Sequence, residues 1–186
     1  MVLEYSFYRQ RMTHILEAAA SGRSKCRGCK KAIAKDALRF GERLPNPFAD
    51  GEMTIYFHVL CAAYRRPESL LEVLDTNPPE LDNADTLRRI VDIGIAHPRA
   101  TRIAGAGVSP SGRARCRGCR EMIAKGEWRL VLEFFEEGMF NPSGYVHAAC
   151  SEDYFGTIDI IDRIEHFADD LEPASFDEIV AAITRD

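Results

Sequence analysis

The sequence has no run of 18 apolar residues, so it offers no candidate membrane-spanning helix. Its first ten residues, MVLEYSFYRQ, are acidic and aromatic where a secretory leader would have a basic start and an apolar core. These two absences predict an intracellular protein, located in the nucleus of a eukaryote or in the cytoplasm and nucleoid of a bacterium. Thiols stay reduced inside cells, so disulfides are not expected.

No cysteine is left over from a pattern of four pairs, each with two intervening residues. The pairs are Cys26/Cys29, His58/Cys61, Cys116/Cys119 and His147/Cys150. A disulfide framework could use six cysteines, and a redox protein could use each Cys-x2-Cys, but neither gives the two histidines a role. Metal ligation explains all eight residues. Three thiolates and one imidazole form a closed tetrahedral shell, which predicts two structural Zn²⁺ ions per chain.

The order of the pairs leaves two ways to share the metals. In sequential sites each Cys-x2-Cys joins the next His-x2-Cys, whereas in a cross-braced arrangement the first pair shares a metal with the third. The 54 residues between Cys61 and Cys116 have a helical pattern, which favours sequential sites. Within each CRGC, Gly28 and Gly118 are expected to adopt positive φ angles. The three remaining histidines (His14, His97 and His166) are expected to be surface or satisfied side chains.

A repeat underlies this arrangement. Residues 22–40, GRSKCRGCKKAIAKDALRF, return as GRARCRGCREMIAKGEWRL at residues 112–130, with ten identical positions. We therefore expect an α+β protein with two small zinc-stabilised modules of short antiparallel strands, each followed by helical segments. The expected divisions are a first module (1–66), a helical linker (67–100), a second module (101–155) and an acidic helical tail (156–186).

The expected elements follow from periodicity and from residue types. Residues 53–59 and 129–135 are rich in β-branched and aromatic residues and predict strands, and a short helix is expected directly after His58 and at the equivalent place after His147. Helices are predicted from Pro67 and over residues 83–96. Apolar residues at helical spacing over 158–171 predict another helix, and Ser175 with Glu178 predicts a capping box at the start of the last one. These apolar faces are expected to be core.

The net charge of −5 is spread unevenly. Residues 13–66 carry 10 basic and 5 acidic side chains, whereas residues 156–186 carry 2 and 9. The net charge of the chain therefore conceals a basic first module and an acidic tail, and the local field matters more than the total for binding. A basic cluster of this kind is a candidate phosphate-binding surface, although its cations could also simply offset a Zn-thiolate centre and face water.

These motifs closely resemble the PARP-type zinc finger of poly(ADP-ribose) polymerases and of one class of DNA ligase. The resemblance lies in the Gly-Arg before the first cysteine, the Cys-x2-Cys, the Ile-x-Lys segment, the arginine ten residues after the second cysteine, and the aromatic residue before His-x2-Cys. It covers about 50 residues twice. It implies recognition of DNA breaks by structure, through backbone phosphates and apolar side chains stacked on exposed bases.

The resemblance also implies which residues contact DNA. Arg23 and Arg39 would hold the backbone in the first module, as would Arg113 and Arg129 in the second, while Phe48 and Met53 would stack on bases. Lys25 and Arg27 add to the basic cluster of the first module. The second module has acidic residues in its spacer, which would repel phosphate, and only Phe140 as an obvious stacking residue, so it is expected to be a weaker DNA contact, a dimer surface or a partner-binding site.

The two modules and their helices occupy the 186 residues, so no transferase or ligase domain, and no catalytic activity, is expected. The predicted function is recognition of strand breaks, ends or nicks in DNA. The alternative is a zinc-stabilised adaptor whose acidic tail binds a protein partner.

Overall fold

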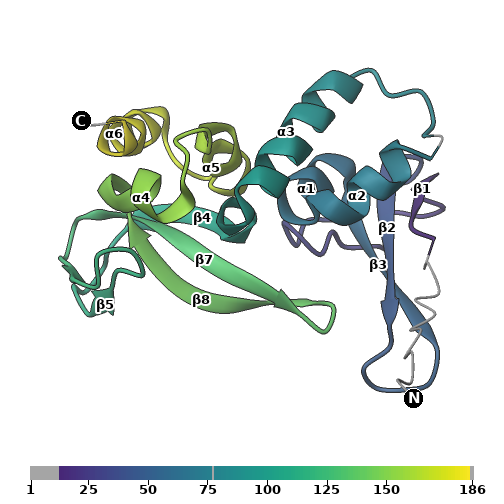
Figure 1. Cartoon of the computed structure of the whole chain (residues 1–186), viewed down its shortest axis with the longest axis horizontal. Coiled ribbons are helices and arrows are strands. Elements are labelled where there is room, and N and C mark those ends of the chain that lie inside the picture. Colours follow the sequence, from purple (N-terminus) through teal and green to yellow (C-terminus); the bar gives the residue numbers. More distant parts are fainter. Residues whose placement is uncertain (1–12, 77, 185–186) are drawn as a thin grey trace, which may run out of the picture.

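The computed structural model describes residues 13–76 and 78–184 (Figure 1). The first half contains β1 (Ile15–Ala18), β2 (Leu38–Pro45), β3 (Glu52–His58), α1 (Val59–Arg65), α2 (Pro67–Leu74) and α3 (Ala84–Ala96). The second half contains the 3-10 helix η1 (Pro98–Arg102), β4 (Ile103–Val108), β5 (Ala114–Arg115), β6 (Met122–Ile123), β7 (Trp128–Glu136), β8 (Met139–His147), the 3-10 turn η2 (Ala148–Cys150), α4 (Ser151–Phe155), α5 (Ile161–Phe167) and α6 (Pro173–Ile183). The predicted α+β class, with short antiparallel sheets and helices, is confirmed.

The two halves repeat one sheet topology. The sheets have the order β1-β2-β3 and β4-β7-β8, and all their strand pairs are antiparallel. Their registers also match, because Arg39 pairs with His58 in the first sheet and Arg129 with His147 in the second. The sequence repeat is therefore a repeat of structure. The nine-residue strands β7 and β8 are longer than the short strands expected from the sequence.

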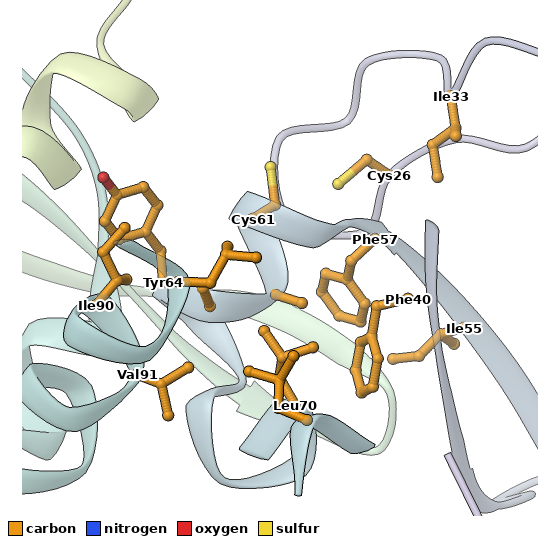
Figure 2. Close-up of a cluster of buried hydrophobic side chains, with 14 of the residues drawn as sticks. Cys26, Ile33, Phe40, Ile55, Phe57, Cys61, Tyr64, Leu70, Ile90 and Val91 are labelled. Carbon is orange, nitrogen blue, oxygen red and sulfur yellow. The ribbon is translucent and has the colours of Figure 1, made fainter. Parts of the chain in front are cut away.

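The first core lies between the β1-β2-β3 sheet and helices α1 to α3 (Figure 2). Alternate residues of β3 point inward, so Ile55 and Phe57 are buried while Thr54 is exposed. Leu70 of α2 and Val91 of α3 have no exposed surface and close the other side of this core. Helices α2 and α3 therefore belong to the first core, together with α1 and the sheet.

The second core contains the C-terminal helices. Ile164 of α5 and Ile179 and Ile183 of α6 are buried with Leu130 and Leu132 of β7. The apolar faces of the acidic segment are thus core, as expected, and the acidic residues of its described part lie on the outside. No helix in the described part of the chain is long and apolar enough to cross a bilayer.

Two helix predictions are wrong at their boundaries. Helix α6 begins at Pro173, after Glu172 as N-cap, so Ser175 lies inside the first turn and forms no capping box. Proline is favoured at the first helical position because its φ is already helical and its missing N–H is not needed there. Helix α5 covers only Ile161–Phe167, and Ile158 lies before it in a turn with 48% of its surface exposed.

The positive φ angles also differ from the prediction. They occur one residue after each Cys-x2-Cys, at Lys30 (66°) and Arg120 (71°), and neither Gly28 nor Gly118 has one. Gly28 serves close packing instead, since a Cβ there would lie 3.1 Å from the Cβ of Cys61.

The two halves touch through one hairpin and one helix. The β7–β8 hairpin points toward the first half, and α5 lies beside α3 (Figure 1). Buried Arg65 of α1 donates to the Ile103 carbonyl (2.6 Å), forms an ion pair with Glu133 and stacks on Phe140 (3.9 Å). Arg163 of α5 donates to the carbonyls of Tyr64 (2.6 Å) and Ile90 (3.1 Å). Both arginines carry charge-assisted hydrogen bonds across the contact.

Candidate metal centres and nucleic-acid interface

Each metal centre is assembled from three adjacent pieces of one module. The Cys-x2-Cys turn precedes the middle strand of the sheet, the histidine ends the third strand, and the last cysteine lies one helical turn later. The groups are Cys26, Cys29, His58 and Cys61, and Cys116, Cys119, His147 and Cys150, with all ligand atoms of a group within 4.8 Å of one another. Sequential sites are therefore correct, and a cross-braced arrangement does not occur.

The donor atoms fit tetrahedral zinc. In the first group Nδ1 of His58 lies 3.4 Å from Sγ of Cys29 and 3.8 Å from Sγ of Cys61, and the second group repeats both distances. Ordinary Zn–S and Zn–N bonds at a tetrahedral angle require about 3.6 Å between these atoms. Four protein donors complete the shell, so each ion would be structural. The two Cys₃His clusters thus fit two structural zinc ions per chain.

The pKa values of the thiols show that neither cluster ionises fully by itself. The side-chain contact with Cys61 lowers the pKa of the Cys26 thiol to about 4, and the same contact raises the pKa of Cys61 above its ordinary value. In the second group burial raises the pKa of Cys150 to about 12. Burial opposes ionisation of Cys116 too, but backbone N–H groups, first that of His147, outweigh it and lower the pKa to about 7. Three thiolates so close together need a divalent ion among them.

Groups outside the ligand shell orient the ligands. Nε2 of His58 lies 3.2 Å from the Ala32 carbonyl oxygen, and Nε2 of His147 lies 3.4 Å from the Glu127 carboxylate. Such partners hold the imidazole with Nδ1 toward the metal. In the first centre Nε2 of His166, from α5, lies 3.1 Å from Sγ of Cys61. His166 is therefore part of the surroundings of a metal centre, which its isolated position in the sequence gave no means of predicting.

The two arginines beside the metal centres occupy equivalent places in different environments. Arg39 stacks on Tyr56 (3.6 Å) and Arg129 on Tyr145 (3.7 Å). Arg39 is only 8% exposed, and its guanidinium donates to the Glu17 carboxylate (2.6 Å) and to Ser24 Oγ (2.7 Å).

In the second sheet Gly107 pairs with Arg129 where Glu17 pairs with Arg39, so no carboxylate is present there. Among the described residues Arg129 has no ion-pair partner. Glu17 is not among the site residues predicted from the sequence, because no motif marks it, although it is one of the five acidic residues of 13–66.

The other predicted DNA contacts divide into exposed and packed residues. Arg23, Lys25 and Arg113 are exposed, Arg27 is half-buried, and Phe48 in the β2–β3 loop has 81% of its surface exposed. Met53 instead lies against the β7–β8 turn, where any side chain at Gly138 would collide with it.

Phe140 also packs inside the molecule, against Arg65 (3.9 Å), Phe135 (4.9 Å) and Phe57 (6.3 Å). It points inward because hairpin β7–β8 leans on the first module. The exposed apolar residues of that hairpin are Phe134 and Met139.

Comparison with known proteins supports the resemblance. Residues 17–92 match the family described as "Poly(ADP-ribose) polymerase and DNA-Ligase Zn-finger region". This match includes α2 and most of α3, which agrees with their place in the first core. The second metal centre, with its repeated sheet, is consistent with a second copy of the same module.

Individual relatives extend this similarity beyond the first module. The chain is similar to poly(ADP-ribose) polymerase 1 of Oryza sativa (30% identity over 151 residues, 75% of this chain and 15% of the relative). It is also similar to the polymerases of Drosophila melanogaster (29% over 133 residues, 64% and 13%) and Caenorhabditis elegans (46% over 50 residues, 27% and 5%). The chain thus spans about a seventh or less of the length of these relatives.

Proposed function

Since the chain carries a zinc finger of the poly(ADP-ribose) polymerase and DNA-ligase family at residues 17–92, we propose that it binds DNA at nicks, ends or other breaks by structure rather than by sequence. The proposed role is that of a binding module, without a catalytic step. One observation carries the proposal: Phe48 has 81% of its surface in water. An aromatic ring so exposed, on a loop of a basic module, suits stacking on an unpaired base.

The charge around this loop supports the same function. Arg23, Lys25 and Arg27 lie in the stretch around the first metal centre, and Arg39 and Arg43 lie on β2, which leads into the Phe48 loop. Continuous duplex offers phosphates but no free base face, whereas a break offers both. Phosphate contacts then supply affinity, and stacking supplies the preference for a break.

Stacking by Phe48 should favour nicked over closed DNA. Phe48→Ala should lower affinity for nicked DNA about tenfold while changing affinity for closed circular DNA less than about twofold, since one stacked base contributes about 1–3 kcal/mol. Binding would be followed by fluorescence anisotropy in a salt series. The matched control is Ile158→Ala, which removes an apolar side chain that is also exposed (48%) but lies in the turn before α5, outside the first module. Equal affinity of the unmodified protein for nicked and closed DNA would exclude break recognition.

The phosphate contact of Arg39 should be independent of the DNA sequence. Arg39→Ala should weaken binding by about the same factor on DNA of different sequences, and should reduce the dependence of affinity on salt, because phosphates carry no sequence information. Affinities for several unrelated nicked duplexes at two salt concentrations measure this effect. A loss confined to some sequences would contradict it.

The adaptor function remains an alternative proposal. Helices α5 and α6 place their apolar faces in the second core, which leaves acidic side chains such as Glu165, Asp170 and Asp177 exposed to a partner. Neutralising these three residues together, without disturbing the core, tests it by pull-down. Unchanged partners would exclude the acidic surface as the docking site.

A further inference from the structure

A hollow of about 550 Å³ lies beside the second metal centre and is lined by arginines. Its lining includes Arg99, Arg102, Arg117, Arg120, Ser143 and Tyr154. None of these residues belongs to the phosphate or base contacts proposed above, and Asp153 is the single acidic residue of the lining. The hollow therefore presents four guanidinium groups to solvent with little opposing charge.

The sequence brings the four arginines together as two pairs three residues apart. Arg99 and Arg102 lie on the 3-10 helix η1, where residues i and i+3 project from the same side. Arg117 and Arg120 lie in and immediately after the second Cys-x2-Cys turn. The metal centre holds that turn against β8, since the Arg117 backbone N–H donates to the Tyr145 carbonyl (2.8 Å). Both pairs thus lie on rigid elements.

Hydrogen bonds orient three of the guanidinium groups without using all their donors. Arg102 donates to Ser143 Oγ (2.5 Å), Arg117 Nε donates to the Ser143 carbonyl (3.0 Å), and Arg99 donates to the Tyr154 carbonyl (3.0 Å). Each guanidinium has five N–H donors, so most of them remain for a ligand. Nε of Arg102 is buried and has no acceptor in the described part of the chain. Donors exceed acceptors throughout the hollow.

Gly144 leaves room for the Arg117 side chain at the edge of the hollow. Gly144 has a φ of 95°, and a Cβ there would lie 3.0 Å from Nε of Arg117. The bare backbone lets the Arg117 side chain lie across β8 toward Ser143. A Zn²⁺ ion with three thiolates adds one negative charge nearby, and Asp153 adds another, so the four arginines leave the hollow positively charged.

We propose that this hollow binds a phosphate group in its most highly charged form, a terminal phosphomonoester or a diphosphate. Planar guanidinium groups bind phosphate oxygens in pairs, and convergent arginines suit a compact polyanion better than one diester of a continuous backbone. The chemistry is the same for a 5′-phosphate at a DNA break and for a free nucleotide. Only the first source depends on the proposed function.

Isothermal titration calorimetry of the whole 186-residue chain, loaded with zinc, with pyrophosphate at about 50 mM salt tests the site itself. Arg120→Gln should weaken binding at least about fivefold and Arg117→Gln/Arg120→Gln at least about tenfold, as expected for charge-assisted hydrogen bonds. The matched control is Arg88→Gln, which removes an exposed arginine in the first half that pairs with Asp75. Among the described residues the Arg120 side chain makes no hydrogen bond, so its replacement should leave the fold and zinc content intact.

Two further binding measurements identify the source of the phosphate. A preference for nicked duplex with a 5′-phosphate over the same duplex with a 5′-hydroxyl, lost in Arg120→Gln, supports the DNA end. Binding of ADP with no preference between the two duplexes supports a free nucleotide.

Pyrophosphate binding that is absent, or equal in Arg120→Gln and Arg88→Gln, overturns the site even if the protein binds nicked DNA. Conversely, pyrophosphate binding that depends on Arg120, in a protein that ignores nicked DNA, supports the hollow and refutes only the proposed function.

Discussion

At the scale of single residues, the carboxylate of Glu17 distinguishes the two modules. It pairs with Arg39 at 2.6 Å, whereas the equivalent position opposite Arg129 is Gly107. A phosphate approaching Arg39 must displace or share this carboxylate, but one approaching Arg129 meets no such competitor. The second module, which the sequence made the weaker candidate, therefore has the more accessible arginine at this position.

Replacing Glu17 should consequently strengthen DNA binding. Glu17→Gln is expected to raise affinity for nicked DNA about threefold at low salt. The substitution breaks the ion pair that occupies Arg39, and it removes a negative charge that would repel an approaching phosphate. Affinities of Glu17→Gln and of Glu68→Gln, which removes an exposed carboxylate from α2, measured at the same salt concentration, test this. If Glu17→Gln weakened binding, orientation of Arg39 by Glu17 would matter more than competition.

At the scale of elements, α5 joins the two modules. Its Ile164 is buried in the second core, while its Arg163 donates to carbonyls of α1 and α3. Burial lowers the pKa of Arg163 to about 10, yet the group stays charged at neutral pH and its hydrogen bonds are charge-assisted. Asp169, just beyond α5, adds an exposed ion pair with Lys31, next to the first metal centre.

Arg163→Met should therefore uncouple the modules. The substitution leaves two buried carbonyls without their donors, and we expect a loss of about 2–4 kcal/mol in the free energy of unfolding. Calorimetry should show one transition in the unmodified protein and two in the variant. Arg88→Gln, which removes an exposed ion pair, should leave a single transition at nearly the same temperature. Two transitions in the unmodified protein would contradict the coupling.

At the scale of the whole molecule, the two metal centres differ in how far their cysteine ligands are exposed to solvent. Cys26 and Cys61 are buried in the first centre, which α5 also contacts through His166, whereas Cys119 is exposed in the second. A chelator should therefore remove zinc in two phases of about one equivalent each, with the second centre emptied first. A chromogenic chelator measures the release, and circular dichroism follows the accompanying loss of structure.

Cys119→Ser provides the control for this assignment. It should abolish the fast phase and leave the slow one, since only the second centre loses a ligand. A single zinc ion in the unmodified protein, or a fast phase that persists in Cys119→Ser, would contradict the assignment of the centres.

Much of the local structure follows from the sequence because it depends on neighbours along the chain. The spacing of Cys26, Cys29, His58 and Cys61 defines a metal site wherever the module lies, and Pro67 begins a helix for the same local reason. The β-branched and aromatic residues of 53–59 likewise predict a strand, and the structure buries one face of it through Ile55 and Phe57. The boundaries that were wrong, at Ile158 and Ser175, lie where a turn or a proline outweighs helical periodicity.

What the sequence alone determined is the pair of zinc modules, their α+β class and the basic character of the first. Only the tertiary structure decided which side chains face solvent and which face each other. Phe140 and Met53 pack where the modules meet, Glu17 covers Arg39 across neighbouring strands, and four arginines from two separate segments surround one hollow. Metal ligands are set by short spacings and strong bonds, whereas these contacts depend on strand pairing and on how elements pack in space, which no local sequence pattern encodes.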